Sequence, residues 1–468
     1  PRPLLWRDAP LIAAPGPRVV RLTGADTALR RSLAERLTGR GVTVLGSTAS
    51  TAPEVVLWFA GDDRPETEPD TTAAIASLRA VLPALGTPPV RLLLITEDAY
   101  STGTHPHTDR PPLHRRPAQA LLHGFALALP EEHRGLSSLS IDLSAQDTPE
   151  AQLDAIEREL ETASPTTPDA GGTVAWRAGR RLTRTATAPA SPVSPTTPLP
   201  PNGTYLITGG AGGLGSALAR DLAERGSPTL VLTGRTPTPP RALLADLRAL
   251  GAHARYEAAD VSEETAVDDL VAGLPPLDAV FHAAGTARPG SLRAKPDDEI
   301  EAVLAAKVRG TTLLAAALRR HGHGNARCVA FSSVSAVLPG LAGALGDYAA
   351  ANSFLDAFTT AERAAGRPWQ TIAFGPVADT GLAGATPPAA STPMTAQAAL
   401  AGLHAALNLD AAHVLLADTT PDDDRAPSEG RGPSRGAGNR ATSHNTPAPA
   451  PADEQRPPPP AAVSYAHL

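Results

Sequence analysis

Four polar residues in the second half of the chain are of the types that transfer a proton to or from a carbonyl group. Tyr348 opens the stretch YAAANSFLDAF, Asn352 follows one helical turn later, Ser333 ends the apolar run CVAFSS, and Lys307 lies in AAKVRG. A tyrosine can donate a proton when a nearby ammonium group and the ribose of a bound cofactor lower its pKa towards the working pH. A serine hydroxyl can hold the carbonyl oxygen, and an asparagine can hold a relay water. Singly, Lys307 also fits a surface lysine and Ser333 a turn; together they predict carbonyl reduction.

A glycine-rich turn earlier in the chain predicts the cofactor that such chemistry needs. Gly209, Gly213 and Gly215 are spaced G-x-x-x-G-x-G between an apolar run at 205–207 and a helical pattern at 216–225. A pyrophosphate can approach a backbone only where no Cβ intervenes, and a helix N-terminus offers free N–H groups and a favourable dipole. The alternative is a glycine-rich loop with no ligand, but the strand–turn–helix context favours a dinucleotide.

The end of the next apolar run, at 229–232, indicates which dinucleotide binds. An acidic residue there would accept from a ribose 2′-OH and favour NAD, whereas an arginine favours the 2′-phosphate of NADP. The chain has Gly234-Arg235-Thr236 at this point and no carboxylate nearby. Although an ordinary exposed arginine is the alternative, the sequence predicts NADP(H).

The elements that must position these residues alternate between strand and helix patterns, which predicts a doubly wound parallel sheet with its ligand at the carboxyl ends of the strands. After the glycine turn and its two strands, strands are expected at 256–261, 277–282, 327–332, 370–374 and 414–416. Helices are expected at 241–250, 263–272, 297–319, 348–363 and 395–407.

The first part of the chain shows the same alternation without a comparable site. Its turn after the first strand, at 23–26, lacks the repeated glycines that phosphate contact requires, and no Ser/His/Asp or metal-ligand cluster is evident. His105, His107 and His114 lie in one Pro/Thr/Arg-rich loop, for which a solvated loop is favoured over a metal site. We expect a structural unit, with strands at 19–22, 42–45, 55–59, 91–96 and 139–143 and helices at 26–37, 71–82, 119–129 and 151–160.

Length and composition limit the classes of protein to consider. The 468 residues suffice for two or three domains; Pro1 at the start and Met394 as the only methionine suggest a segment of a longer polypeptide. The absence of a long apolar stretch predicts a soluble chain, a single cysteine (Cys328) fits a reducing cytosol, and a net charge of −7 without a basic block argues against nucleic acid. We expect a structural subdomain at 1–190, a Pro/Ser/Thr linker at 191–201, the cofactor-binding subdomain at 202–418 and a disordered Pro-rich tail at 419–468.

Several stretches closely resemble the ketoreductase domains of modular type I polyketide synthases, which belong to the short-chain dehydrogenase/reductase superfamily. They are TGGAGGLGSALARDLA, HAAG, AAKVRG, FSSVSA, YAAANSFLDAF and AFGP. Upstream, PAQALLHGFALALPEEHRGLSSLSIDLS and AWRAGRRLTRTA resemble the structural subdomain of that family, a truncated dinucleotide fold without cofactor. Most of the superfamily has Y-x-x-x-K; here Asn352 takes the lysine position and Lys307 is displaced, as in these ketoreductases.

The resemblance implies an α/β fold of two Rossmann-like doubly wound subdomains and the NADPH-dependent reduction of a β-ketoacyl thioester. The implied partners are an acyl carrier protein bearing the chain on phosphopantetheine and other domains of a cytoplasmic antibiotic synthase, with no metal, nucleic acid or membrane. Tyr348, Ser333, Lys307 and Asn352 would be catalytic. The implied cofactor contacts are Thr208, Gly209, Gly210, Gly212, Gly213, Leu214, Gly215, Gly234, Arg235, Thr236, Asp260 and Val261, then His282, Ala283, Ala284, Gly285, Lys307, Tyr348, Gly375 and Pro376.

Two features depart from the family pattern. Ser333 precedes Tyr348 by fifteen residues, about two more than usual, so either the loop PGLAGALG carries an insertion or Ser335 takes the serine role; we favour Ser333 because it ends the strand. The Leu-Asp-Asp signature after HAAG is replaced by Ala287-Arg288-Pro289, and the tryptophan expected before the tyrosine is absent. The missing Leu-Asp-Asp favours the class that gives an L-hydroxy product.

Two rival interpretations follow from the same residues. The chain could be a catalytically silent, cofactor-binding module of a synthase, or a free-standing sugar-nucleotide epimerase or alcohol dehydrogenase of the superfamily. The presence of all four catalytic residue types argues against the first, and Asn352 together with the inert N-terminal half argues against the second. Residues 380–393, rich in Ala, Thr and Pro, are expected to close over substrate.

Overall fold

The computed structural model describes residues 1–46, 49–61, 69–87, 89–103, 116–162, 172–187, 199–378, 380 and 393–417. Residues 1–419 form one compact unit. The expectations for the histidine loop at 105–114, for most of the lid at 380–393 and for the tail after 418 concern residues outside these ranges. Among the described residues, no helix is long and apolar enough to cross a membrane.

Seven parallel strands form the sheet of the C-terminal half, in the order β11-β10-β9-β12-β13-β14-β15. This order reverses between β9 and β12, so a crevice opens at the carboxyl ends of these two strands, where doubly wound sheets bind their ligands. The predicted doubly wound parallel sheet is confirmed. The strands are β9 (Thr204–Thr208), β10 (Thr229–Gly234), β11 (His253–Ala258), β12 (Ala279–His282), β13 (Arg327–Ser333), β14 (Trp369–Phe374) and β15 (His413–Leu416).

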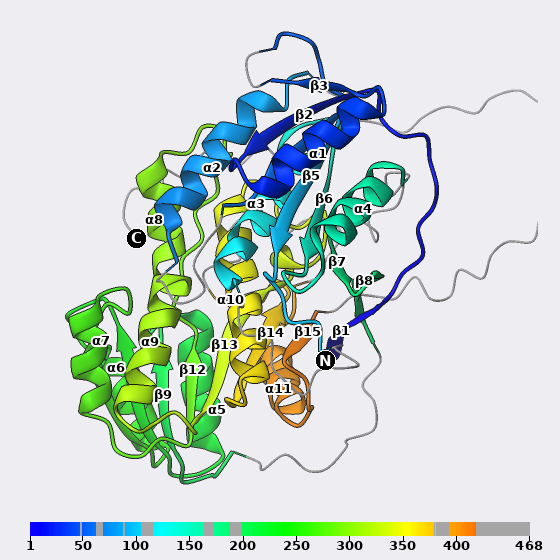
Figure 1. Cartoon of the computed structure of the whole chain (residues 1–468). Coiled ribbons are helices and arrows are strands. Elements are labelled where there is room, and N and C mark those ends of the chain that lie inside the picture. Colours follow the sequence, from blue (N-terminus) through cyan, green and yellow to red (C-terminus); the bar gives the residue numbers. More distant parts are fainter. Residues whose placement is uncertain are drawn as a thin grey trace, which may run out of the picture. The chain divides into compact units, whose positions relative to one another are not determined.

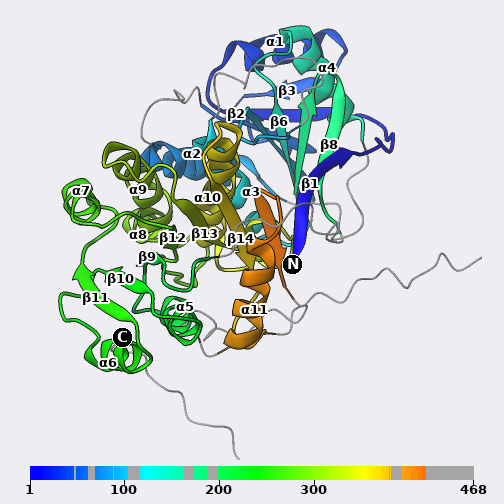
Figure 2. The same ribbon diagram turned by 90° about the horizontal axis from the view of Figure 1, so that it is seen from below.

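Helices cover both faces of this sheet because its strands are apolar on both faces (Figures 1 and 2). Tyr205 and Ile207 of β9 pack in a core with α5, α6 and α11, whereas Leu206 between them packs in a second core with α7 and α9. A strand buried on both faces reads as a continuous apolar run, which is how β9 appears in the sequence. The helices are α5 (Gly213–Glu224), α6 (Arg241–Ala249), α7 (Glu264–Ala272), α9 (Arg309–Arg320), α10 (Gly346–Ala364) and α11 (Ala396–Leu407).

The single helix expected at 297–319 is wrong: the structure has two helices, α8 (Asp297–Lys307) and α9, separated at Val308. Val308 is a turn residue between them, with φ −94° and ψ −74°, at the edge of the helical region. The Thr311 hydroxyl donates to the Lys307 carbonyl oxygen, a bond of the kind that bends helices. At Gly310 a Cβ would lie 2.9 Å from Val261, so α9 packs closely against the segment after β11. The break places Lys307 at the end of a helix.

The N-terminal half is a second mainly parallel sheet, in the order β3-β2-β4-β5-β6-β7, followed by the antiparallel strand β8. Helices α1 and α4 share a core with one face, and α2 and α3 with the other. The strands are β2 (Val19–Gly24), β3 (Thr43–Leu45), β4 (Val55–Phe59), β5 (Val90–Glu97), β6 (Leu136–Leu143), β7 (Thr173–Arg177) and β8 (Arg180–Ala186). The helices are α1 (Ala28–Gly39), α2 (Thr71–Ala84), α3 (Ala120–Glu132) and α4 (Pro149–Leu160).

An unexpected first strand, β1 (Arg2–Asp8), joins the two halves. Its first two residues pair with β15 of the C-terminal half, and the next five pair with β8 of the N-terminal half, both antiparallel. The described strands therefore belong to one continuous fifteen-stranded sheet. The division into subdomains at 1–190 and 202–418 stays a prediction.

A close helix contact also joins the halves. A Cβ added at Gly124 of α3 would lie 2.3 Å from the Cα and N atoms of Ala350 in α10, so the two backbones touch where neither residue has a large side chain. Ala349 and Ala351 are fully buried in the same apolar core. Because α10 begins with the segment that carries Tyr348, α3 of the N-terminal half supports the helix of the predicted proton donor.

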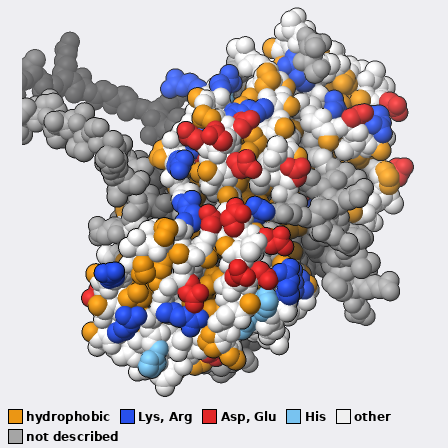
Figure 3. All heavy atoms as spheres, turned by 90° about the vertical axis from the view of Figure 1, so that its left-hand side faces the viewer, with side chains coloured by type: hydrophobic (Ala, Val, Ile, Leu, Met, Phe, Trp, Pro, Cys, Tyr) orange, Lys and Arg blue, Asp and Glu red, His pale blue; other side chains and the backbone are white. Residues whose placement is uncertain are grey.

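The surface is mixed in charge on the face that lies on the left of Figure 1. Figure 3 shows acidic and basic side chains interspersed there, with single hydrophobic side chains between them. One of the ion pairs between the halves joins Arg79 of α2 to Asp297 of α8.

Candidate active site

The glycine turn after β9 is built so that backbone atoms meet where side chains would otherwise lie. Gly209 has φ +67°, a conformation that favours glycine, and a Cβ there would lie 2.9 Å from the backbone of Ala283. A Cβ at Gly215, in the first turn of α5, would lie 2.3 Å from the Gly209 carbonyl oxygen. The turn thus leaves the N-terminus of α5 open, as the sequence predicts for a phosphate site.

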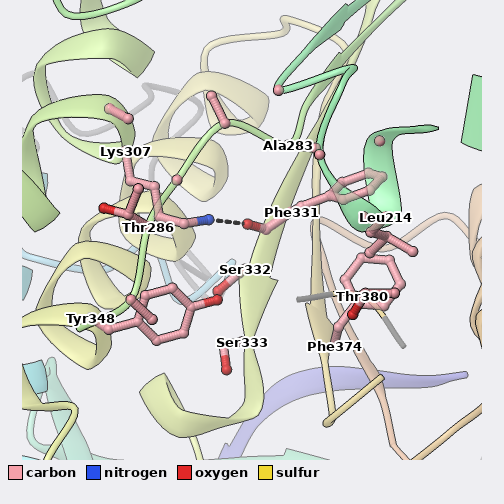
Figure 4. A pocket seen from close by; sticks show the side chains of 18 of the residues that line it. Leu214, Ala283, Thr286, Lys307, Phe331, Ser332, Ser333, Tyr348, Phe374 and Thr380 are labelled. Atoms are coloured by element: carbon pink, nitrogen blue, oxygen red, sulfur yellow. Dashed lines mark hydrogen bonds between the residues drawn. The ribbon is translucent and has the colours of Figure 1, made fainter. Parts of the chain in front are cut away.

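This turn forms one end of a cavity of about 980 Å³ at the carboxyl ends of the strands. Figure 4 shows Lys307, Ser333 and Tyr348 on one side of the cavity and Leu214, Phe374 and Thr380 on the other. The structure therefore brings most of the predicted site residues together. Those that line the cavity are Gly209, Gly212, Gly213, Leu214, Gly215, Gly234, Arg235, Thr236, Asp260, Val261, Ala283, Ala284, Gly285, Lys307, Ser333, Tyr348, Gly375 and Pro376.

Three residues predicted to contact the cofactor, Thr208, Gly210 and His282, lie behind the cavity wall instead. Thr208 and His282 are buried and share a hydrogen bond of 2.7 Å between Oγ1 and Nδ1, and the Thr208 hydroxyl also accepts from the N–H of Ala284. A Cβ at Gly210 would meet Leu232 at 2.9 Å, so this glycine permits close packing rather than phosphate contact. Burial, together with the charge of Lys307, lowers the pKa of His282 to about 3. These three residues support the backbone that forms the cavity wall and do not line the cavity themselves.

The part of the cavity next to the ends of β10 and β11, away from Tyr348, has the polar groups expected around an adenosine. Arg235 is exposed at the rim, and within the described part of the chain its guanidinium has no hydrogen bond or ion pair. Asp260 Oδ1 accepts from the N–H and the hydroxyl of Ser262, which fixes its carboxylate at the cavity wall. Tyr256, which sequence reasoning missed, also lines the cavity and donates to the Thr236 carbonyl oxygen at 2.8 Å.

Lys307 reaches the cavity from the end of α8 through a gap left by Gly285. A Cβ on Gly285 would lie 2.6 Å from Lys307 Cε, so the glycine of HAAG makes room for the lysine stem. The ammonium group donates to the Phe331 carbonyl oxygen at 2.5 Å (Figure 4) and lies 5.8 Å from the centre of the Tyr348 ring. Burial lowers the pKa of Lys307 to about 8, and the charge of Asp356 opposes this shift.

Tyr348 lies in the first turn of α10, with Asn352 below it on the same face. Burial raises the pKa of Tyr348, and the side chains of Asn352 and Ser333 act in the opposite direction. Desolvation of the phenol dominates in the chain itself, and the expected lowering of this pKa by Lys307 together with a cofactor ribose stays a prediction. Asn352 is fully buried and does not line the cavity; its Nδ2 donates to the Tyr348 carbonyl oxygen at 2.8 Å. Its Oδ1 has no hydrogen-bond partner among the described residues.

The hydrogen bonds of Ser333 and Ser335 distinguish the two candidate serines. Both line the cavity, but Ser335 is buried and donates its hydroxyl proton to Ser333 Oγ at 3.0 Å. The N–H of Ser335 also points to Ser333 Oγ, at 3.2 Å. Ser333 Oγ accepts both bonds, so its own proton remains available for a carbonyl oxygen.

We predict that Ser333→Ala lowers turnover about tenfold because one hydrogen bond to the reacting oxygen is lost. Ser335→Ala should change turnover less than threefold, since it removes only a supporting bond. Steady-state kinetics of the two variants would show this difference; a larger loss in Ser335→Ala would transfer the role to that residue.

Other contacts at the site could not be read from the sequence. Lys295 and Asp347 form an ion pair of 2.6 Å in which both side chains are almost fully buried, and Asp347 Oδ1 accepts the N–H of Tyr348. Glu131, at the end of α3 in the N-terminal half, lines the cavity. A helix C-terminus disfavours carboxylates, so the position of Glu131 and Glu132 at the end of α3 is the sequence feature that could have drawn attention to them. Among the described residues, no group of three or more His, Cys, Asp or Glu side chains could hold a metal ion.

The fold and the site define a protein of the dinucleotide-binding class, with a doubly wound sheet whose glycine turn adjoins its topological switch point. Comparison with known proteins narrows this class. Residues 203–379 match the family model described as KR domain. The chain is 43% identical over 212 residues to polyketide synthase GfsB and 33% identical over 364 residues to polyketide synthase GfsA, both from Streptomyces halstedii. These matches span 44% and 76% of this chain but only 4% and 5% of those relatives.

Solved structures give the same result. The first ketoreductase of the tylosin polyketide synthase is 27% identical, with a TM-score of 0.71 over 89% of this chain and 92% of that chain. PlmKR1, the ketoreductase from the first module of phoslactomycin biosynthesis in Streptomyces sp. HK803, is also 27% identical, with a TM-score of 0.69 over 89% and 93%. The chain belongs to the family of ketoreductase domains of modular polyketide synthases.

Proposed function

We propose that this chain reduces the β-keto group of an acyl thioester to a β-hydroxyacyl thioester with NADPH. The observation that carries the proposal is that Tyr348, Ser333 and Lys307 line the same cavity as the glycine turn. Proton donor, carbonyl support and cofactor cradle thus face one another.

The residues present fit a dinucleotide, and of the two dinucleotides they favour NADP. A Cβ at Gly209 or Gly215 would collide with neighbouring backbone, so these glycines let the turn close and leave the N-terminus of α5 at the cavity, where a pyrophosphate would accept from its N–H groups. Arg235 follows the neighbouring strand β10, has no hydrogen bond or ion pair with other described residues, and is suited to bidentate binding of the 2′-phosphate. When bound, NADPH would supply the hydride.

The side chains of this chain would supply the proton and the orientation. Tyr348 would donate its proton to the carbonyl oxygen, and its raised pKa keeps that proton in place until the oxygen gains negative charge. Ser333 would hold the same oxygen through its free hydroxyl proton. The Lys307 cation would stabilise the tyrosinate that remains. Asn352 contacts the Tyr348 carbonyl oxygen, so its role would be to fix the first turn of α10.

The family suggests the form in which the substrate arrives. Because the relatives are polyketide synthases, we propose a chain carried on the phosphopantetheine of an acyl carrier protein, with other domains of a cytoplasmic synthase as neighbours. On this proposal residues 1–190 are a structural subdomain and 202–418 the catalytic subdomain. The replacement of Leu-Asp-Asp by Ala287-Arg288-Pro289 favours the L-hydroxy product.

The test is the loss of reduced-nicotinamide absorbance with the purified chain, a β-ketoacyl thioester, and either NADPH or NADH. Turnover that prefers NADPH, with an L-hydroxy product by chiral analysis, is the expected result. NADPH binding without turnover on several β-keto thioesters would favour the silent module instead. No binding of either nucleotide would overturn the proposal.

The pH dependence of reduction should follow Lys307. With a pKa of about 8, its ammonium group is charged below pH 8 and neutral above it, so kcat/KM should fall as pH rises through about 8. Tyr348 has a raised pKa and stays protonated across this range, which is the form that donates. In Lys307→Arg the guanidinium remains charged, so the fall should disappear up to pH 10. Profiles of kcat/KM between pH 6 and 10 test this; the same fall in both proteins would assign it to another group.

A further inference from the structure

Two carboxylates at the end of α3 reach from the N-terminal half to the loops around the cavity, and one of them, Glu131, lines it. Glu131 and Glu132 are the last residues of that helix, where the negative end of the helix dipole disfavours acidic side chains. A sequence that breaks a local rule in this way often does so for function. Their bonds go to two segments of the C-terminal half, each of which faces the cavity.

The first of these segments follows the HAAG sequence. Glu132 accepts from the Ser291 hydroxyl at 2.7 Å and from the N–H of Leu292 at 3.0 and 2.9 Å. Thr286, Ala287 and Pro289, just before Ser291, line the cavity. A single carboxylate thus fixes the base of the loop that stands where the sequence lacks the Leu-Asp-Asp signature.

The second segment is the loop before Tyr348. Glu131 Oε1 accepts from the N–H of Ala342 at 2.8 Å, and a Cβ on Gly343 would lie 2.8 Å from Glu131 Oε2. Leu341, Gly343 and Leu345 line the cavity. The two loops also bind each other, because the N–H of Gly290 donates to the Ala344 carbonyl oxygen at 2.8 Å.

Both loops lead directly to Tyr348. Leu292, held by Glu132, packs so closely on the first residue of α10 that a Cβ on Gly346 would lie 2.4 Å from it. At the end of the same loop, Lys295 pairs with Asp347, which accepts the N–H of Tyr348. A shift of either loop would therefore move the proton donor and the cavity wall together.

We propose that Glu131 and Glu132 are positioning residues for the keto substrate, so that the N-terminal half takes part in the active site. This inference rests on the proposed ketoreductase function. The loops that the two residues hold flank Tyr348, whereas the glycine turn and Arg235 lie at the other end of the cavity and have no bond to α3 among the described residues. Substrate turnover should depend on the two carboxylates, and NADPH affinity should not.

The experiment compares the full chain with Glu132→Ala, Glu132→Gln and the double variant Glu131→Ala/Glu132→Ala. Glu35→Ala is the matched control, because Glu35 is an exposed glutamate on α1 of the same half and has no hydrogen bond or ion pair with other described residues. We expect kcat/KM for a β-ketoacyl thioester to fall at least tenfold in Glu132→Ala and further in the double variant. The NADPH Kd should stay within twofold of the original in each. Glu132→Gln, which still offers one oxygen to Leu292, should recover part of the loss.

A second measurement is independent of turnover. Amide hydrogen exchange in peptides covering 288–296 and 338–346 should be faster in the Glu132→Ala and double variants, and exchange in β9 and β10 should not change. Unchanged exchange in the two loops, or a loss of NADPH affinity equal to the loss of kcat/KM, would overturn the inference. If the parent chain itself does not reduce the thioester, the proposed function fails, and the exchange data alone decide whether the carboxylates hold the loops.

Discussion

Replacing Tyr348 by phenylalanine should reduce turnover by a factor of about a thousand while NADPH still binds. The ring and its packing remain, but the proton that the carbonyl oxygen must receive is lost, and general acid catalysis contributes about 10² to 10⁴. Steady-state NADPH oxidation gives the rate, and titration of nucleotide fluorescence gives the affinity, which should change less than threefold.

Tyr205→Phe is the matched control for this substitution. Tyr205 is buried in β9 and donates to the Pro200 carbonyl oxygen, far from the carboxyl ends of the strands. Loss of this hydrogen bond should lower the free energy of unfolding by about 1 kcal/mol and leave turnover unchanged. Comparable rates in Tyr348→Phe and the parent chain would show that another group gives the proton.

Adding one methyl group at Gly215 should weaken NADPH binding by about tenfold to a hundredfold. In Gly215→Ala the new Cβ would lie 2.3 Å from the Gly209 carbonyl oxygen, so the turn must open or α5 must shift. Overpacking of this kind costs about 1–3 kcal/mol, and here the cost falls on the conformation that receives the pyrophosphate. Fluorescence titration with NADPH measures the change.

The control for Gly215→Ala is Gly39→Ala, at the end of α1. A Cβ at Gly39 would have no atom within 4 Å, so neither the fold nor nucleotide affinity should change. Equal affinities in Gly215→Ala and Gly39→Ala would mean that the dinucleotide does not contact this turn.

Local sequence patterns were sufficient to predict those parts of the site that lie within a single helix, strand or turn. The glycine turn, the end of β13 and the first turn of α10 each combine a backbone requirement with a chemical residue, so residue type and place within one element were enough to propose Gly215, Ser333 and Tyr348. The apolar runs of β9 and β4, buried on both faces, likewise predicted a parallel sheet.

What the sequence could not predict depends on contacts between distant segments. The break at Val308 depends on the packing of Gly310 against Val261, while the apolar pattern continues through it. The raised pKa of Tyr348 depends on how much water the folded chain removes. The positioning role of Glu131 and Glu132 could not be predicted, because it depends on hydrogen bonds from the N–H groups of two loops that are distant in sequence.

The placement of β1 between β8 and β15 bears on how this chain is made. Residues 2–8 are synthesised before both of their pairing partners, and one of these, at 413–416, is among the last described residues to be synthesised. Pairs so distant in sequence form slowly. Until β15 is made, the edge of β1 that faces away from β8 stays unpaired, and such an edge invites association with other chains. Expression of the N-terminal half alone would leave this edge of β1 unpaired, so a segment that keeps both pairings of β1 must extend from β1 to β15.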